Sequence, residues 1–253
     1  MLRRLPHPGR GFTQGLIVGR DMVWESSGGY GESAVRRYPL GARQPEGESA
    51  LPAELFGEGI CPAGDHFVQL TWRERVALRW DPHTLELAGQ VRYNREGWGI
   101  CAVGGSVVTS DGTSELVWRD PQTLAPQQVI HVRCGARRVL GLNDLAWAPS
   151  SAAPSSAPGG TIWANVAGTH YLAGIDPASG DVTDIVNARP AAERHADPQA
   201  IMNGIAALPA VSGTSGSGEF LLTGKGWQWI RRVRLKPTRE GAAQRGLLAG
   251  FSH

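Results

Sequence analysis

Apolar residues in this chain fall into short runs, and almost no stretch repeats them with the 3.6-residue period of an amphipathic helix. Two examples of these short apolar runs lie at 16–18 and 205–208. Each is only a few residues long and directly follows a glycine. The chain also holds 34 Gly, 17 Pro and 9 Trp, a composition typical of many short strands joined by many turns. We therefore expect an all-β protein.

One turn motif recurs along the chain. Asp-Pro occurs at 81–82, 120–121 and 176–177, and a degenerate copy ends at Pro39. The Asp side chain can bond the backbone two residues further on, and Pro pre-sets the first turn dihedral, so each copy predicts a hairpin. The successive prolines are 43, 39 and 56 residues apart. The last interval falls to 44 without the 12-residue Ser/Ala/Pro/Gly tract at 149–160.

A second series runs out of phase with these turns. Each member places a polar or aromatic residue beside glycine before a short apolar run, and the members lie at 12–16, 56–60, 96–100, 141–145 and 202–206. Four short strands with their turns fill roughly 40 to 45 residues, the size of one propeller blade. We therefore predict a single five-bladed β-propeller domain over residues 1–253, with flexible insertions near 149–160 and 211–218. A sandwich or jelly roll gives no reason for such an interval.

The propeller geometry predicts where a functional site lies. The innermost strand of each blade lines the central channel, so residues at the same phase of every repeat converge on one end of the axis. The residues expected to form this ring are Gln14, Glu58, Trp98, Asn143 and Asn203. Polar groups that converge beside aromatic walls are typical of a small-ligand pocket.

Glu58 is the most informative residue of the ring, because it lies between two glycines in an apolar stretch. Taken alone, such a carboxylate is equally well explained as a solvated turn residue, and its phase match with the other segments favours a site. Lys225, also flanked by glycines, has the same two interpretations. Gln14 and Asn143 can instead satisfy backbone groups at blade ends.

Charge and motif content exclude several classes of protein. A net charge of +2 with scattered arginines provides no basic face for nucleic acid. No run approaches the roughly 18 to 20 apolar residues of a membrane span. The 3 cysteines cannot all pair and lack metal-ligand spacing, so they indicate neither a disulfide framework nor a zinc site. As written, residues 1–9 do not form an export signal, and the compartment stays open.

A set of short stretches occurs in a fixed order between about residue 10 and residue 235. They lie at 12–16, 27–33, 56–59, 69–72, 97–99, 110–113, 162–166 and 223–225. Together they resemble the plant-type glutaminyl-peptide cyclotransferases, the glutaminyl cyclases of plants and bacteria. The resemblance implies a five-bladed propeller, unrelated to the zinc-dependent animal type, that converts the N-terminal glutamine of peptides or proteins into pyroglutamate with loss of ammonia.

The resemblance also implies roles for individual residues. The essential carboxylate falls on Glu58, and Lys225 and Asn143 join it as catalytic residues. The substrate-binding residues that it implies are Phe12, Gln14, Trp72, Trp98 and Met202. It requires no cofactor for catalysis and leaves room for a structural calcium ion on the propeller axis. We expect the chain to act as a monomer.

The sequence departs from the family pattern at two places. After Trp-Ala-Asn-Val the family continues with Trp-Gln-Thr-Asp, whereas this chain has Ala167, Gly168, Thr169 and His170, so one pocket-wall indole is missing. The acidic stretch after Asn143 also loses its second carboxylate, at Ala146. These departures predict an altered substrate fit and rate.

The residue types suit the chemistry of cyclisation. The α-amine, with an ordinary pKa of about 7.7 to 8.0, is already partly neutral, and the departing amide nitrogen must receive a proton to leave as ammonia. One carboxyl group between the two nitrogens can move that proton, and we assign this role to Glu58. Burial would raise the pKa of Glu58 and Lys225 would oppose this. Lys225 or Asn143 would stabilise the oxyanion.

Two other functions stay open on the sequence alone. The first is a propeller lactonase, in which Glu58, Asn143 and Asn203 hold an axial calcium ion that polarises an ester carbonyl. The second is a non-catalytic propeller that binds peptide N-termini. Chelator sensitivity separates the lactonase from the cyclase, and loss of ammonia from a peptide with N-terminal glutamine separates the enzyme from the binder.

Overall fold

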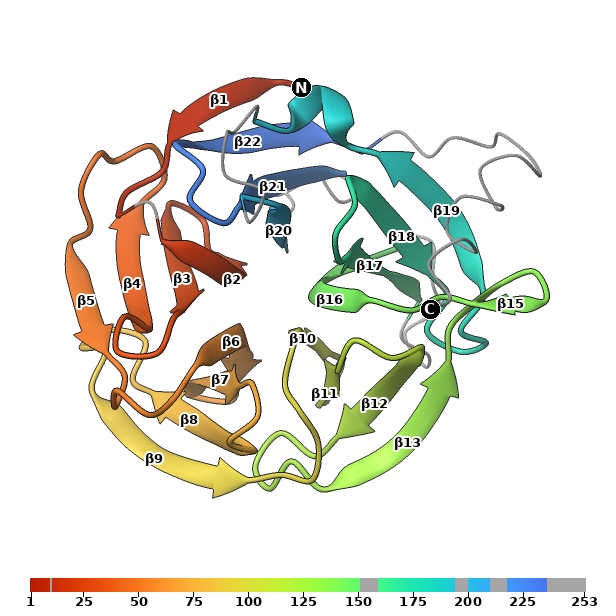
Figure 1. Ribbon diagram of the computed structural model, residues 1–253, viewed down its shortest axis with the longest axis horizontal. Coiled ribbons are helices and arrows are strands. Elements are labelled where there is room, and N and C mark those ends of the chain that lie inside the picture. Colours follow the sequence, from red (N-terminus) through yellow and green to blue (C-terminus); the bar gives the residue numbers. More distant parts are fainter. Residues whose placement is uncertain (10, 151–158, 194–199, 210–217, 236–253) are drawn as a thin grey trace.

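The structure is a computed structural model that describes residues 1–9, 11–150, 159–193, 200–209 and 218–235. Five four-stranded antiparallel sheets surround a common axis, so the expected five-bladed propeller is confirmed (Figure 1). In the described ranges, the regular elements outside the blades are a two-stranded ribbon and one 3₁₀ turn. No helix in the same ranges is long and apolar enough to span a membrane. Most of the predicted insertions near 149–160 and 211–218 lies outside the described residues.

The strands of each blade are given from the axis outward. The first blade contains β2 (Phe12–Val18), β3 (Met22–Gly28), β4 (Ala34–Pro39) and β5 (Gly47–Ala50). The second contains β6 (Gly57–Ala63), β7 (His66–Thr71), β8 (Val76–Trp80) and β9 (Leu87–Arg92). The third contains β10 (Ile100–Val103), β11 (Ser106–Thr109), β12 (Glu115–Arg119) and β13 (Pro126–His131). The fourth contains β16 (Leu142–Pro149), β17 (Gly160–Val166), β18 (Tyr171–Ile175) and β19 (Val182–Asn187). The fifth contains β20 (Met202–Ala207), β21 (Glu219–Gly224), β22 (Trp229–Arg234) and β1 (Arg3–Pro6). The ribbon is β14 (Arg133–Cys134) with β15 (Arg137–Arg138), and the 3₁₀ turn is η1 (Arg189–Ala191).

The predicted Asp-Pro turns connect the third and fourth strands of three blades. In the second blade, Asp81 Oδ1 accepts hydrogen bonds from the backbone N–H groups of His83 and Thr84, both at 2.8 Å. Asp120 and Asp176 make the equivalent pairs of bonds in the next two blades. The aspartate therefore fixes each turn by satisfying two backbone donors that the hairpin leaves free.

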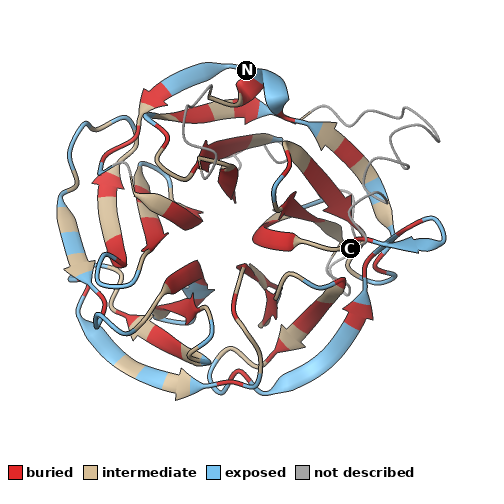
Figure 2. Ribbon diagram, viewed as in Figure 1, coloured by how far each residue is buried: buried red, intermediate tan, exposed pale blue. Residues whose placement is uncertain are grey.

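The hydrophobic core lies between neighbouring blades. One cluster, for example, packs Ile17 and Val35 of the first blade against Leu78 and Trp80 of the second. Figure 2 shows the buried residues gathered on the inner strands, with the exposed residues on outer strands such as β9 and β13. Apolar surface is thus removed from water between sheets, which holds the blades in a ring.

The ring closes through the N-terminal strand. β1 pairs antiparallel with β22, with Leu5 opposite Ile230, so the first residues of the chain complete the last blade. Leu5 is buried, and its cluster joins residues of the first and fifth blades. The two ends of the propeller sequence are therefore held together by one strand pairing and one apolar cluster.

We expect Leu5→Ala to lower the free energy of unfolding by about 2 to 5 kcal/mol, the usual cost of emptying a well-packed leucine site. Leu2→Ala is the matched control, because Leu2 is 51% exposed and its truncation leaves no cavity. Urea denaturation of both variants measures the difference. Equal stabilities for the two variants would show that the closure does not depend on Leu5.

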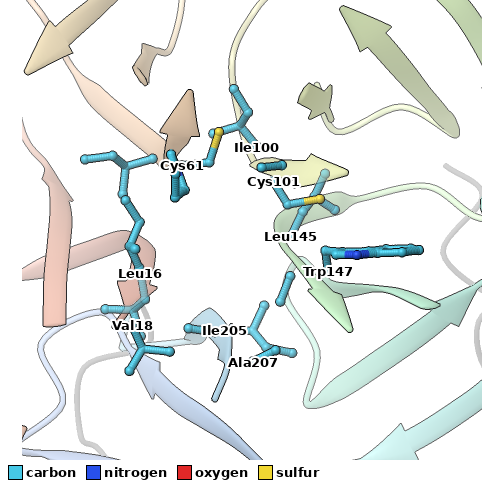
Figure 3. A pocket seen from close by; sticks show the side chains of 15 residues that line it. Leu16, Val18, Cys61, Ile100, Cys101, Leu145, Trp147, Ile205 and Ala207 are labelled. Atoms are coloured by element: carbon cyan, nitrogen blue, oxygen red, sulfur yellow. The ribbon is translucent and has the colours of Figure 1, made fainter. Parts of the chain in front are cut away.

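The inner strands also surround an apolar cavity of about 200 Å³ near their C-terminal ends. Figure 3 shows the side chains that line it, which include Leu16, Ile100, Leu145 and Ile205 from different blades. The residues predicted to form the site lie earlier on the same strands or, for Trp98, just before one of them. The predicted site therefore lies toward the opposite end of the axis.

Candidate active site

A cavity of about 340 Å³ lies at the N-terminal ends of the inner strands. It is lined by Phe12, Gln14, Phe56, Glu58, Trp72, Trp98, Asn143, Ala167, Ile201 and Lys225. These residues come from all five blades and from positions more than 200 residues apart in the chain. The spatial convergence expected from the repeat phase is therefore present.

Irregularities in the inner strands present the polar residues of the site. Register shifts occur between Thr13 and Gly15, Gly57 and Ile60, Leu142 and Leu145, and Met202 and Ile205. The shifted segments carry Gln14, Glu58, Asn143 and Asn203. A β-bulge breaks the alternation of side chains and re-aims one of them, which explains why polar residues at the same phase face the axis.

Glycine at the next position lets the inner strands approach one another. A Cβ atom on Gly15 would lie 2.8 Å from the backbone nitrogen of Ile60, and one on Gly59 would lie 2.8 Å from that of Ile100. Gly59 also donates a backbone hydrogen bond of 2.9 Å to the carbonyl of Trp98 on the next blade. The glycines noted in the sequence therefore serve backbone contact between blades.

The fourth blade replaces this glycine with Asp144. Its Oδ2 atom accepts a 2.8 Å hydrogen bond from the backbone N–H of Ile205, so the carboxyl group bridges β16 to β20. Asp144 is buried, and burial raises the pKa of its carboxyl group well above the ordinary value. When it is ionised, Asp144 in turn raises the pKa of Glu58 in the nearby site.

Glu58 is 5% exposed and receives a hydrogen bond of 3.2 Å from Gln14 Nε2. Gln14 is itself oriented by Asn203, whose Nδ2 donates to Gln14 Oε1 at 2.8 Å. Burial raises the pKa of Glu58 well above its ordinary value, Lys225 opposes the rise, and Asp144 adds to it. Both main effects on the pKa of Glu58 have the expected direction, and the raised pKa makes its carboxylate a stronger proton acceptor than an exposed one.

Lys225 follows β21, in a turn against the first blade. Its Nζ atom lies 4.4 Å from the centroid of the Phe12 ring. Its backbone N–H donates to the carbonyl of Ile201 at 3.0 Å. Burial lowers the pKa of the Lys225 ammonium group, and the negative charge of Glu58 opposes this shift. The site therefore pairs a partly desolvated ammonium group with a buried carboxyl group.

Two polar atoms of the pocket are buried and have no hydrogen-bond partner among the described residues. They are the indole Nε1 of Trp98 and the Oδ1 atom of Asn143. Buried polar atoms are normally satisfied, so unpaired ones in a cavity indicate groups that a ligand completes. One donor and one acceptor suit a ligand that carries both a carbonyl oxygen and an amine.

Met202 and Asn203 are the two expected site residues that do not line the cavity. The Met202 side chain packs in a hydrophobic cluster with Trp163 and Trp227. Ile201, one residue earlier, lines the cavity instead. Asn203 also lies behind the wall, where it orients Gln14. The other expected residues, Glu58, Lys225, Asn143, Phe12, Gln14, Trp72 and Trp98, all line the cavity.

The two departures from the family pattern lie in different places. Ala167 is part of the pocket wall, so the small side chain leaves the cavity wider there. Ala146 lines the apolar cavity at the other end of the axis. Only the first departure therefore alters the surface that faces a ligand.

The fold and the pocket together define a propeller enzyme whose carboxyl and ammonium groups act on a small ligand within aromatic walls. The family model described as glutamine cyclotransferase matches residues 1–235. A glutaminyl-peptide cyclotransferase of Arabidopsis thaliana is 28% identical over 238 residues, which cover 93% of this chain and 71% of that protein. The crystal structure of Myxococcus xanthus glutaminyl cyclase is 30% identical, with a TM-score of 0.80 over 94% of this chain and 96% of that chain. The chain therefore belongs to the glutamine cyclotransferase family, a group of acyltransferases.

Proposed function

We propose that this protein converts the N-terminal glutamine of peptides and proteins into pyroglutamate, with Glu58 as the proton shuttle. The supporting observation is that the buried carboxyl group of Glu58 lies in a pocket with aromatic walls, with Gln14 hydrogen-bonded to it and Lys225 opposing its pKa shift. A carboxyl group in such a place can both accept and deliver a proton.

The proposed reaction forms one bond and breaks one bond. The neutral α-amine attacks the side-chain carbonyl carbon of the same glutamine and gives a tetrahedral intermediate. The Glu58 carboxylate takes a proton from the attacking nitrogen and then gives it to the departing nitrogen, which leaves as ammonia while the carbonyl re-forms. The walls formed by Trp72 and Trp98 hold the chain folded for ring closure, an orientation effect that lowers the barrier.

The remaining polar groups fit the charges that develop. The ammonium group of Lys225 stabilises the oxyanion of the intermediate. The unpaired Oδ1 atom of Asn143 accepts a hydrogen bond from the α-amine, and the indole N–H of Trp98 donates to a carbonyl oxygen of the substrate. In this arrangement the two unpartnered atoms, Trp98 Nε1 and Asn143 Oδ1, gain hydrogen-bond partners when the substrate is bound.

The arrangement of Asn203 argues against a lactonase. That reaction needs Glu58, Asn143 and Asn203 to face a common ion, whereas Asn203 lies behind the wall and donates to Gln14 and to the backbone carbonyl of Thr13. Glu58 is likewise engaged by an amide donor. The proposed cyclase reaction is compatible with the hydrogen bonds of both Asn203 and Glu58.

The test is incubation with a short peptide that begins with glutamine, followed by mass spectrometry. We expect the peptide to lose the mass of one ammonia molecule much faster than it does without enzyme, and an α-N-acetylated copy to stay unchanged. A purely binding protein would retain the peptide without any mass change. We expect EDTA to leave the rate unchanged as long as the protein stays folded, whereas a rate that vanishes with EDTA while the fold is intact would favour the metal-dependent, lactonase type of mechanism.

We keep the structural calcium ion as part of the proposal. The Oδ1 atoms of Asp144 and Asn203 are buried and unpartnered among the described residues, and calcium prefers such oxygen ligands. These two residues would supply two of the oxygen ligands of the ion, and its role would be to stabilise the axis. We also propose a monomer in solution, which gel filtration tests.

A further inference from the structure

His7 and Glu25 form a buried ion pair at the seam where the propeller closes. Neither side chain is exposed to solvent, and His7 Nε2 lies 2.9 Å from Glu25 Oε1. His7 follows β1 of the fifth blade, whereas Glu25 lies on β3 of the first. The proposed reaction gives no role to either residue.

The hydrogen-bond network assigns a charge to both groups. Glu25 accepts hydrogen bonds from Thr13 Oγ1 at 2.7 Å and from the Tyr38 hydroxyl at 2.9 Å, in addition to His7. The other ring nitrogen of His7, Nδ1, donates to the carbonyl of Trp227 at 2.7 Å. Because the Trp227 carbonyl can only accept, His7 Nδ1 carries a hydrogen, and the two hydroxyl donors on Glu25 favour an ionised carboxyl group, to which a protonated His7 donates from Nε2. The pKa of His7 is raised and that of Glu25 lowered, mainly by each other's charge against the effect of burial.

One arm of this network reaches the Lys225 turn. Trp227, whose carbonyl accepts from His7, is two residues after Lys225, and its backbone N–H donates to the carbonyl of Gly224 at 3.1 Å. Gly226 donates to the carbonyl of Gly11 at 3.0 Å, so the turn is also tied to the N-terminal segment. His7 therefore holds the turn that carries the pocket ammonium group.

The second arm reaches Glu58. Thr13, which donates to Glu25, directly precedes Gln14, and Gln14 donates to Glu58. The groups that face the pair from the surrounding elements are Thr13, Tyr38, Thr223, the Trp227 carbonyl and, at longer range, Glu193. Thr223 Oγ1 lies 3.3 Å from His7 Nδ1, so β21 also contacts the pair just before the Lys225 turn.

We propose that the buried His7 of this pair positions Lys225 for catalysis through the hydrogen bond from its Nδ1 atom to the Trp227 carbonyl. This inference rests on the proposed role of Lys225. Removing one partner of a buried ion pair usually disturbs the structure around the charge that remains. A test must therefore separate the loss of the link from a general loss of stability.

Two substitutions at His7 test the roles of its two ring nitrogens separately. The amide nitrogen of His7→Asn can occupy the place of Nδ1 and keep the bond to the Trp227 carbonyl, whereas that of His7→Gln can occupy the place of Nε2 and keep the bond to Glu25. We expect His7→Gln to lower kcat about 10- to 100-fold, since a displacement of about 1 Å can have an effect of this size, with little change in KM. We expect His7→Asn to retain most of the rate.

Tyr38→Phe is the matched control for stability. It removes one hydrogen bond to Glu25 from the same buried cluster but leaves both arms intact. We expect it to lower the melting temperature without lowering kcat. Equal losses of kcat in His7→Asn and His7→Gln, or a kcat that follows the melting temperature across all three variants, would overturn the positioning role.

A double-mutant cycle completes the test. When Lys225→Met is already present, we expect His7→Gln to have no further effect on kcat, because there is no ammonium group left to position. An additive loss would overturn the inference while leaving the role of Lys225 intact. If Lys225→Met alone leaves kcat unchanged, the proposed role of Lys225 fails first and the positioning role fails with it.

Discussion

Glu58→Gln is expected to lower kcat by about a hundredfold or more, the usual contribution of general acid–base catalysis. The amide keeps the shape of the carboxyl group and can still accept the hydrogen bond from Gln14. It cannot take a proton from the α-amine and give it to the departing nitrogen. Turnover of a glutamine-initial peptide, followed by ammonia release, measures the effect.

The same variant is expected to be at least as stable as the parent at neutral pH. Burial raises the pKa of Glu58, so the native state is fully favoured below the ordinary carboxyl pKa and loses stability as the pH rises and the group ionises. Glutamine removes this penalty. Urea denaturation at neutral pH checks the stability, and Glu48→Gln on the outer strand β5 is the control for activity. Near-native turnover in folded Glu58→Gln would exclude the shuttle.

The fold could be predicted because the repeated turns have a local cause. Asp81 and its equivalents fix a hairpin through bonds to the next few residues, so their interval reveals the blade. The closure of the ring could not be predicted in the same way. Its pairing joins Leu5 to Ile230, and β1 has only 4 residues with no motif of its own. Such a non-local pairing leaves no periodic signal in the sequence.

The site could be predicted to the extent that it repeats with the blades. Gln14, Glu58 and Asn143 occupy equivalent irregular positions of the inner strands. In the sequence, each is a polar residue directly before the position at which two inner strands approach one another, and this pattern reveals them. Met202 packs in a hydrophobic cluster, whereas Ile201, just before β20, lines the cavity, so the repeat phase alone does not decide which of two neighbouring residues faces the pocket.

The buried pair of His7 and Glu25 could not be predicted at all. Each is an isolated polar residue on a separate segment, and only the closure of the ring brings them together. A repeat analysis finds what every blade shares, whereas this pair exists at one seam. The site therefore combines residues that recur with blade phase and residues, such as Lys225, that depend on how the first and last blades meet.

Lys225→Met is expected to lower kcat by about 100- to 1000-fold, the usual effect of removing an oxyanion-stabilising group. The substitution keeps a long apolar side chain near Phe12 and removes only the ammonium group. Arg73→Met is the matched control, because it removes a cation that stacks on the pocket residue Trp72 but is itself exposed. A comparable loss in both variants would mean that general electrostatics, rather than a contact with the oxyanion, explains the effect.

The pH dependence gives a second, independent readout of Lys225. The positive charge of Lys225 lowers the pKa of Glu58, in opposition to burial, so its removal must raise that pKa further. Glu58 then stays protonated to a higher pH, and the carboxylate that accepts the proton from the α-amine appears later. The acidic limb of the kcat/KM profile should therefore move to higher pH in Lys225→Met and stay in place in Arg73→Met. An acidic limb that does not move would show that Glu58 and Lys225 do not share one site during the reaction.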